Sequence, residues 1–170
     1  MDSTALNTIS YTGQVNLAWY NNGKKMPFAQ IHNIGGNTLF DFIVDCLLGD
    51  FTKASKEKPA KVALLNAAKD PSGEHITRSS LWVWVTETTI PTVIPQANGC
   101  TIRYSFIIPQ EYITSNFNSI GLYPTHINDT ALDKYCAICE VKGQTNFNFN
   151  AATALAVDWD LNFTNSTTTL

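Results

Sequence analysis

Apolar residues alternate with polar or small residues, without a break, in the segment TALAVDWDLNF at residues 153–163. A period of two is typical of a β-strand that turns one face to the core and the other to solvent or a partner. Trp159 would anchor the core face, whereas Asp158 and Asp160 would lie on the opposite face. The segment therefore predicts a late strand.

Several other segments show a strand-like pattern and are separated by connectors rich in Pro, Gly, Asn and Asp. In residues 100–109, Ile102, Tyr104 and Phe106 share one face. The sequence predicts an antiparallel two-sheet sandwich, jelly-roll or immunoglobulin-like, of roughly seven to nine strands in a single domain over residues 1–170. The remaining strand segments are residues 61–67, 80–88, 117–125 and 135–142.

An opening strand pair is expected near the N-terminus. Residues 14–20 alternate in polarity, and the Asn22-Gly23 pair that follows is a strong signal for a hairpin turn. The second arm is weaker because its Pro27 lacks a backbone N–H. The two ends of the chain, residues 1–10 and 165–170, are expected to form extended arms that reach to neighbours.

The spacing of apolar residues no longer alternates as in a strand in the segment GGNTLFDFIVDCLLGD. An Asn-Thr pair is placed to begin a helix, and Gly49 is placed to end it in the left-handed conformation. Between them, only Asp41 and Asp45 interrupt the apolar residues. A helix that is apolar around so much of its circumference is expected to be buried on several sides. The sequence therefore predicts one buried α-helix near residues 37–48, at the end or flank of a sheet.

Charged residues make up only 15% of the chain, and the net charge is −3. A soluble protein usually has roughly 25% charged residues, so this surface fits either permanent contacts with neighbours or a neutral β-rich monomer. The lysine-rich run at residues 53–61 contains Glu57 and is interpreted as a solvated loop, so no nucleic-acid partner is expected. The first ten residues lack the features of a secretory signal, and no apolar run is long enough to cross a membrane.

Metal and nucleophile motifs are weak. Cys136 and Cys139 form a CxxC pair without a second pair at zinc spacing, so we expect buried, reduced thiols. His32, His75 and His126 have no ligand at the usual spacing, and no nucleophile elbow or phosphate-binding loop is present. We therefore expect no catalytic, cofactor-binding or metal-binding residue, and no enzyme.

Two patterns could indicate a glycan site. Trp82 and Trp84 share one strand face and, with Tyr123, could stack on sugar rings, but both faces of that strand are apolar, which favours core or subunit contact. The paired carboxylates Asp158 and Asp160 beside a tryptophan fit a glycan-cleaving site. No third acid or histidine is near them in sequence, so we interpret them as the outer side of a strand.

The order of five motifs resembles that of a group of tailed-bacteriophage virion proteins. The motifs are HNIGGNTLFDFIVDCLLGDF, KVALLNAAKDPSG, TIRYSFIIPQEYITSNFNSIGLYP, YCAICEV and TALAVDWDLNFTN, and the resemblance covers residues 28–165. The chain departs from the group at residues 118–121, where NSIG replaces an acidic residue before the GLY motif.

The resemblance implies a non-enzymatic virion structural protein without a cofactor, assembled in the cytoplasm of a bacterial host. The expected role is a capsid decoration (cement) protein, with a tail, neck or baseplate component as the alternative and a carbohydrate-binding module as a further one. The expected partners are copies of the chain, with a trimer favoured, and the major capsid protein or tail and neck proteins. No direct contact with nucleic acid or membrane is expected.

Overall fold

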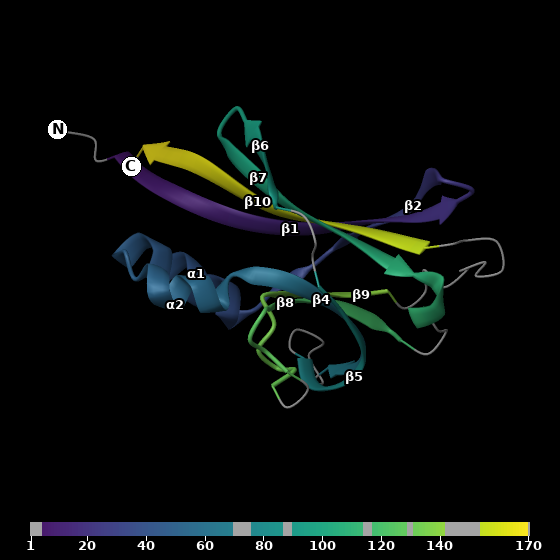
Figure 1. The fold of residues 1–170 in the computed structure, drawn as a ribbon. Helices are drawn as coiled ribbons and strands as arrows, with labels where there is room; N and C mark the ends of the chain where they lie inside the picture. Colours follow the sequence, from purple (N-terminus) through teal and green to yellow (C-terminus); the bar gives the residue numbers. More distant parts are fainter. Residues whose placement is uncertain are drawn as a thin grey trace.

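The described strands form two five-stranded sheets in which neighbouring strands run antiparallel, as Figure 1 shows. This arrangement confirms the predicted mainly-β, two-sheet fold. The computed structural model describes residues 5–69, 76–86, 90–113, 117–128, 131–141 and 154–169, and only the backbone of residues 5–8, 28, 66–69, 76–86 and 167–169.

The first sheet is built around a long central pair of strands. Its order is β2 (Lys24–His32), β1 (Ala5–Asn21), β10 (Ala154–Thr169), β7 (Gly99–Pro109) and β6 (Thr92–Gln96). β1 and β10 pair from Ala5 with Thr169 to Tyr20 with Ala154, so the start of β1 and the end of β10 lie side by side in Figure 1. The expected separate arms are therefore paired with each other over the part of residues 5–10 and 165–169 that the structure describes.

The second sheet has the order β3 (Ile34–Gly35), β9 (Ala137–Glu140), β8 (Ser119–Pro124), β4 (Pro59–Lys69) and β5 (Ile76–Thr86). It lies below the first sheet in Figure 1. Each expected strand segment between residues 61 and 142 has a counterpart among the described strands. The structure adds β3 and β6. The strand β6 falls within residues 90–99, which the sequence predicts to be a connector because of Pro95 and the Pro, Asn and Gly residues around it.

The main hydrophobic core lies between the two sheets, and a second cluster covers the outer face of the second sheet. Ala63 and Leu65 of β4 belong to this second cluster, whereas Val62 and Leu64 belong to the main core. Burial on both faces explains why residues 61–67 are almost continuously apolar. The first sheet contributes Val15, Leu17, Tyr104, Phe106, Leu155, Val157, Trp159 and Leu161 to the main core.

The turn between β1 and β2 follows the sequence signal. Asn22 and Gly23 both adopt positive φ angles, of 49° and 76°, which a tight two-residue hairpin requires. The predicted hairpin is confirmed.

The predicted helix is also present, as α1 (Asn37–Leu48), and it ends at Gly49 with φ 74° in the left-handed conformation. A second helix, α2 (Phe51–Glu57), follows at once, where Asp50 accepts a hydrogen bond from the backbone N–H of Lys53. The interpretation of residues 53–61 as a loop is therefore wrong, because residues 53–57 lie in α2 and residues 59–61 lie in the strand β4. A short 3₁₀ helix (Gln110–Tyr112) follows β7.

The expectation that α1 is buried on several sides is wrong. Only Thr38 and Leu39 of this helix are buried, whereas Phe40, Val44, Leu47 and Leu48 are exposed. Leu39 belongs to the main core, and the Phe40 ring lies 6.3 Å from that of Tyr11 on β1. The helix thus lies at the rim of the sandwich, with one side on the sheets and the other facing outward. Among the described residues, no helix has the length and apolar character that crossing a membrane requires.

Candidate functional site

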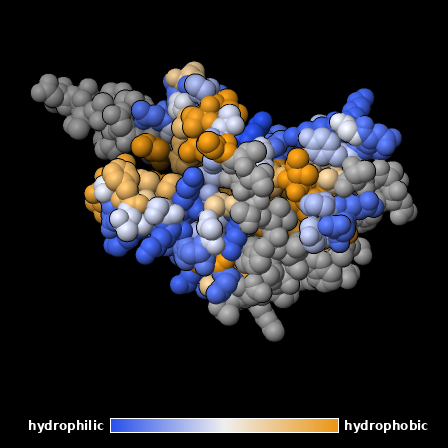
Figure 2. All heavy atoms as spheres, viewed as in Figure 1, coloured by the Kyte–Doolittle hydropathy of each residue, from blue (hydrophilic) through white to orange (hydrophobic). Residues whose placement is uncertain are grey.

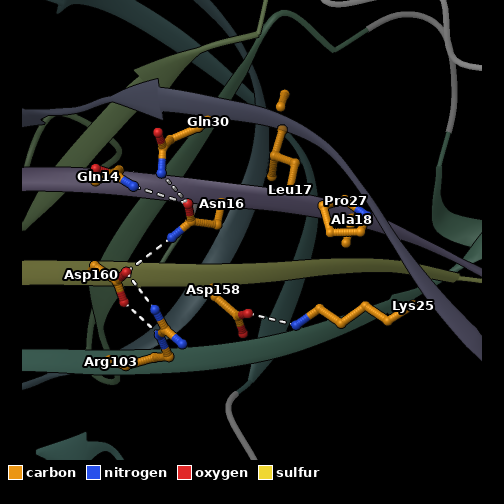
Figure 3. A pocket seen from close by; sticks show the side chains of 11 residues that line it. Gln14, Asn16, Leu17, Ala18, Lys25, Pro27, Gln30, Arg103, Asp158 and Asp160 are labelled. Atoms are coloured by element: carbon orange, nitrogen blue, oxygen red, sulfur yellow. Dashed lines mark hydrogen bonds and ion pairs between the residues drawn. The ribbon is translucent and has the colours of Figure 1, made fainter. Parts of the chain in front are cut away.

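The outer face of the first sheet carries a cleft of about 750 Å³ (Figure 3). Side chains from β1, β2, β7 and β10 line it, together with the apolar groups of Ala18, Pro27 and Ala29. The cleft contains both aspartates of the closing strand, so the structure brings these residues together in one hollow. The polar lining residues are Gln14, Asn16, Lys25, Gln30, Arg103, Asp158 and Asp160.

Asp160 is bound from two sides. Arg103 donates from Nε to Oδ1 and from Nη2 to Oδ2, both at 2.7 Å, and Asn16 donates from Nδ2 to Oδ2 at 2.9 Å. The aspartate is only 6% exposed, so a two-bond pair with a guanidinium supplies the partners that its burial requires. The hydrogen bond to Asp160 raises the pKa of Arg103 above its ordinary value.

Asp158 has its own partners. Lys25 donates from Nζ to Oδ2 at 2.6 Å, and Ser105 donates from its hydroxyl to Oδ1 at 2.8 Å. These bonds join β2 and β7 to β10, which lies between β1 and β7 in the sheet. The two ion pairs are similarly exposed, because the Lys25 side chain is 40% exposed and that of Arg103 is 36% exposed. They differ in their bonds, since Lys25 makes one bond to its carboxylate and Arg103 makes two.

Amide side chains extend this network along β1. Gln14 and Gln30 each donate to the Oδ1 atom of Asn16 at 3.0 Å, and Asn16 in turn donates to Asp160. Figure 3 shows this chain of amides running from β1 and β2 to the carboxylate. The network fixes the orientation of Asn16, because both ends of its amide are engaged.

The chemistry of the cleft favours binding over bond cleavage. Each carboxylate is paired with a cation, so the described charges of the lining, two positive and two negative, compensate each other. The Asp160 carboxylate is held by two guanidinium bonds and an amide, so it has little freedom to turn toward a substrate and act as a nucleophile. The sequence placed both aspartates on the outer face of a strand, and this is confirmed. It missed Arg103, Lys25 and Asn16, which lie far from the aspartates along the chain.

The cysteines are free thiols. Cys136 and Cys139 are buried in the main core, and Cys136 lies one residue before β9. Burial raises the pKa of Cys139 to about 12 and that of Cys136 well above its ordinary value. Within the described residues, no group of three or more His, Cys, Asp or Glu side chains could hold a metal ion.

The two histidines that the structure describes lie in different segments of the chain. His126 is exposed, its Nε2 atom lies 3.9 Å from Glu57 Oε1, and His32 is exposed on β2. His75 lies outside the described residues.

The aromatic residues proposed for sugar stacking are not available as a group. Tyr123 is fully buried in the second cluster, and its hydroxyl donates to the backbone oxygen of Leu132 at 2.8 Å. The expectation that Tyr123 stacks on a sugar is therefore wrong. Trp82 and Trp84 lie on β5, but their side chains fall outside the part of the structure that is described.

A second candidate site is apolar and lies on the helices. We define the helix face as the exposed large apolar side chains of α1 and of the start of α2, together with Ile9. Ile9 lies on the same face of β1 as Tyr11. Leu47, Leu48 and Phe51 are 77%, 76% and 71% exposed. Figure 2 shows hydrophobic residues gathered over the two helices. The helix face consists of Ile9, Phe40, Val44, Leu47, Leu48 and Phe51.

The fold and these two surfaces define a class, a two-sheet antiparallel sandwich with a polar outer cleft and an exposed apolar helix pair. No family model, no curated protein and no solved structure matches the chain significantly. The resemblance to virion proteins therefore stays a prediction.

Proposed function

We propose that this chain is a non-enzymatic structural protein of a bacteriophage virion, and specifically a capsid decoration (cement) protein that stabilises the head through subunit contacts. The observation that carries the proposal is the helix face. Large apolar side chains are rarely left uncovered over a contiguous surface unless another molecule binds there. A protein whose task is to hold neighbours together needs such a surface and needs no catalytic group.

The composition and the fold support the same role. Only 15% of the residues are charged, which suits a surface that is permanently in contact with neighbours. Val93 on β6 and Ile107 on β7 add exposed apolar groups on the first sheet, so more than one side of the molecule offers contact area. A decoration protein has at least two kinds of contact, to the capsid lattice and to its own copies.

The mechanism would be adhesive. Apolar surface removed from water between subunits contributes roughly 25 cal/mol per Å², before the costs of ordering and association are subtracted. Bridging two capsid subunits in this way raises the free energy needed to separate them. The protein would then act against the internal pressure of packaged DNA without any chemical step.

Particles that lack this protein provide the test. We expect them to release DNA at a lower temperature than complete particles, and we expect the added wild-type protein to restore the difference. The Leu47→Glu/Leu48→Glu variant should fail to restore it. Ile90→Glu is the matched control, because Ile90 is also exposed but lies in the segment before β6, outside both helices. Particles that are equally stable with and without the protein would refute the cement role.

The alternative position is the tail, neck or baseplate, where the same adhesive contacts would serve a smaller assembly. Copy number separates the two positions. A head decoration protein is present in numbers that match the capsid lattice, whereas a tail or neck component follows the low symmetry of the tail. Quantitative mass spectrometry of purified virions gives this number. A low copy number would reject decoration and leave the structural role intact.

One observation favours a second candidate function, carbohydrate binding. The cleft of the first sheet combines compensated charges with the amides of Gln14 and Gln30 and an apolar floor at Ala18 and Pro27, which suits a neutral ligand with many hydroxyls. Glycan-array binding by the wild-type chain, lost in Gln30→Ala and kept in Gln110→Ala, would support it. Absence of binding to any glycan would reject it.

A further inference from the structure

We propose that the helix face of one copy is covered by the helix face of a second copy in a two-fold arrangement, with α1 of each copy against α2 of the other. This inference rests on the proposed function, because it names the partner of the surface on which that function depends. It concerns the assembly unit that forms before any contact with the capsid.

The exposed residues of α1 lie on one stripe. Phe40, Val44, Leu47 and Leu48 follow the i, i+4, i+7, i+8 spacing of a single helical face, and Phe51 continues it at the start of α2. This is the pattern of a helix that packs on another helix. Within the described residues the stripe stays largely uncovered. α2 contacts α1 and the Phe40 ring lies against Tyr11, but Leu47 and Leu48 remain 77% and 76% exposed.

Charge is divided between the two helices. The segment from α1 to the start of α2 has three acidic residues and no basic one, namely Asp41, Asp45 and Asp50. α2 and the residue after it have Lys53, Lys56 and Lys58 against the single acid Glu57.

These charges border the apolar stripe. Asp41 and Asp45 are three residues before Val44 and Leu48, respectively, and therefore flank these side chains on the helix surface. Within the described residues Lys53 reaches Asp50 at 3.4 Å, and the salt bridges recorded there do not involve Asp41, Asp45 or Lys56.

A second copy of this chain matches this distribution of charge. When a two-fold axis passes through the helix face, the acidic α1 of each copy meets the basic α2 of the other, so both contacts are attractive. A partner of uniform charge would repel one of the two helices. The self-complementary pattern therefore selects a copy of this chain, and it selects a two-fold pair in place of the trimer that the sequence favoured.

The size of the surface is sufficient. The exposed fractions of the six side chains leave on the order of 700 Å² of apolar surface on each copy, close to the roughly 800 Å² per partner of a standard stable interface. Polar groups at the rim add to this area. The face is large enough for a stable pair without any contribution from other parts of the chain.

Two charge-reversed variants of the full chain test the pairing. Asp41→Lys/Asp45→Lys makes both helices basic, and Lys53→Glu/Lys56→Glu makes both acidic. Light scattering should give wild type twice the monomer mass of 18.8 kDa in the tens of micromolar range, and each variant alone the mass of one chain, with association weakened at least tenfold. Mixing the two variants should restore the double mass, because α1 and α2 of unlike partners attract again.

The controls use exposed residues away from the helices. Glu111→Lys, in the 3₁₀ helix after β7, and Lys24→Glu, at the turn between β1 and β2, carry the same kinds of charge change at the end of the molecule opposite the helices (Figure 1), and they should leave the pair intact. Far-ultraviolet circular dichroism of each variant confirms that the helices are formed. Leu47→Glu/Leu48→Glu should also give single chains, and mixing should not rescue it.

Three results would overturn the pairing: a single-chain mass for wild type, reversed variants that associate like wild type, or a mixture that stays monomeric or forms a trimer. The proposed function has a separate outcome. A wild-type protein that is monomeric in solution but restores the heat stability of depleted particles would reject the pairing and keep the structural role.

Discussion

The strand β10 and the helix α1 are both rich in apolar residues in the sequence, but these residues lie in different environments in the structure. In β10 the apolar residues Leu155, Val157 and Trp159 are buried in the main core, and Asp158 and Asp160 on the other face are held by Lys25 and Arg103. In α1 the apolar residues are divided. Leu39 is buried and Phe42 and Ile43 pack against the main core, whereas the side that carries Val44, Leu47 and Leu48 is exposed. The salt bridges of the described residues do not involve its acids, Asp41 and Asp45.

The difference shows what a hydrophobic pattern does and does not determine. A strand in the middle of a sheet has neighbours on both edges and a sheet below it, so its apolar face is covered within the chain. A helix at the rim contacts the sheets with one side only, and its other side must find a partner outside the chain. Substitutions in β10 should therefore change folding, whereas substitutions in α1 should change association.

The largest effect is expected at the core side of β10. Trp159→Ala should lower the free energy of unfolding by about 3–5 kcal/mol, because it leaves a cavity between the sheets. Trp159→Phe should cost much less, because the indole N–H is buried and has no hydrogen-bond partner among the described residues. Urea denaturation at low protein concentration measures both. As the counterpart on α1, Leu48→Ala should change stability by less than about 0.5 kcal/mol.

A smaller effect is expected on the outer face of β10. Asp160→Ala should cost about 2 kcal/mol, because it leaves Arg103 and Asn16 without their shared acceptor. Asp158→Ala should cost less than about 1 kcal/mol, because Lys25 makes only one bond to this carboxylate, through a flexible and partly exposed side chain. Thermal unfolding of the two variants under the same conditions ranks their losses of stability. Equal losses would mean that the paired guanidinium bonds and the Asn16 amide add nothing.

A third prediction compares the thiol of Cys139 in the main core with that of Cys46 on α1. The pKa of Cys139 in the folded core is raised from 9.0 to about 12 by burial, so the unfolded chain loses this proton at a lower pH than the folded chain does. Stability should be unchanged below pH 9.0 and should fall as the pH rises from there toward about 12. Tm measured across this range should fall less steeply in Cys139→Ala. Cys46 on the half-exposed side of α1 should react with a thiol reagent in the folded protein, whereas Cys139 should not.

Much of the framework could be predicted from the sequence, because it depends on local signals. The alternation in β10, the Asn22-Gly23 turn and the stop of α1 at Gly49 are each determined by a few neighbouring residues. Two local predictions were wrong because each depended on a single type of residue. Lysines suggested a loop where α2 forms, and Pro95 suggested a connector where β6 forms.

The site could not be predicted to the same extent, because its parts come from distant segments. Arg103 is 57 residues from Asp160, and Lys25 is 133 residues from Asp158. Only the strand order β2-β1-β10-β7 brings them together. The exposure of α1 was missed for the same reason, since an apolar circumference indicates that a helix will be covered but does not say whether the cover belongs to the same chain.

The most direct test of this account is hydrogen exchange of α1 and β10 by mass spectrometry, in the dilute isolated chain and in the assembled particle. The account predicts that the amides of α1 exchange at least tenfold more slowly in the particle, because the helix face is covered there, while those of central β10 are equally slow in both states. Unchanged exchange of α1 on assembly would contradict the claim that another molecule completes this surface.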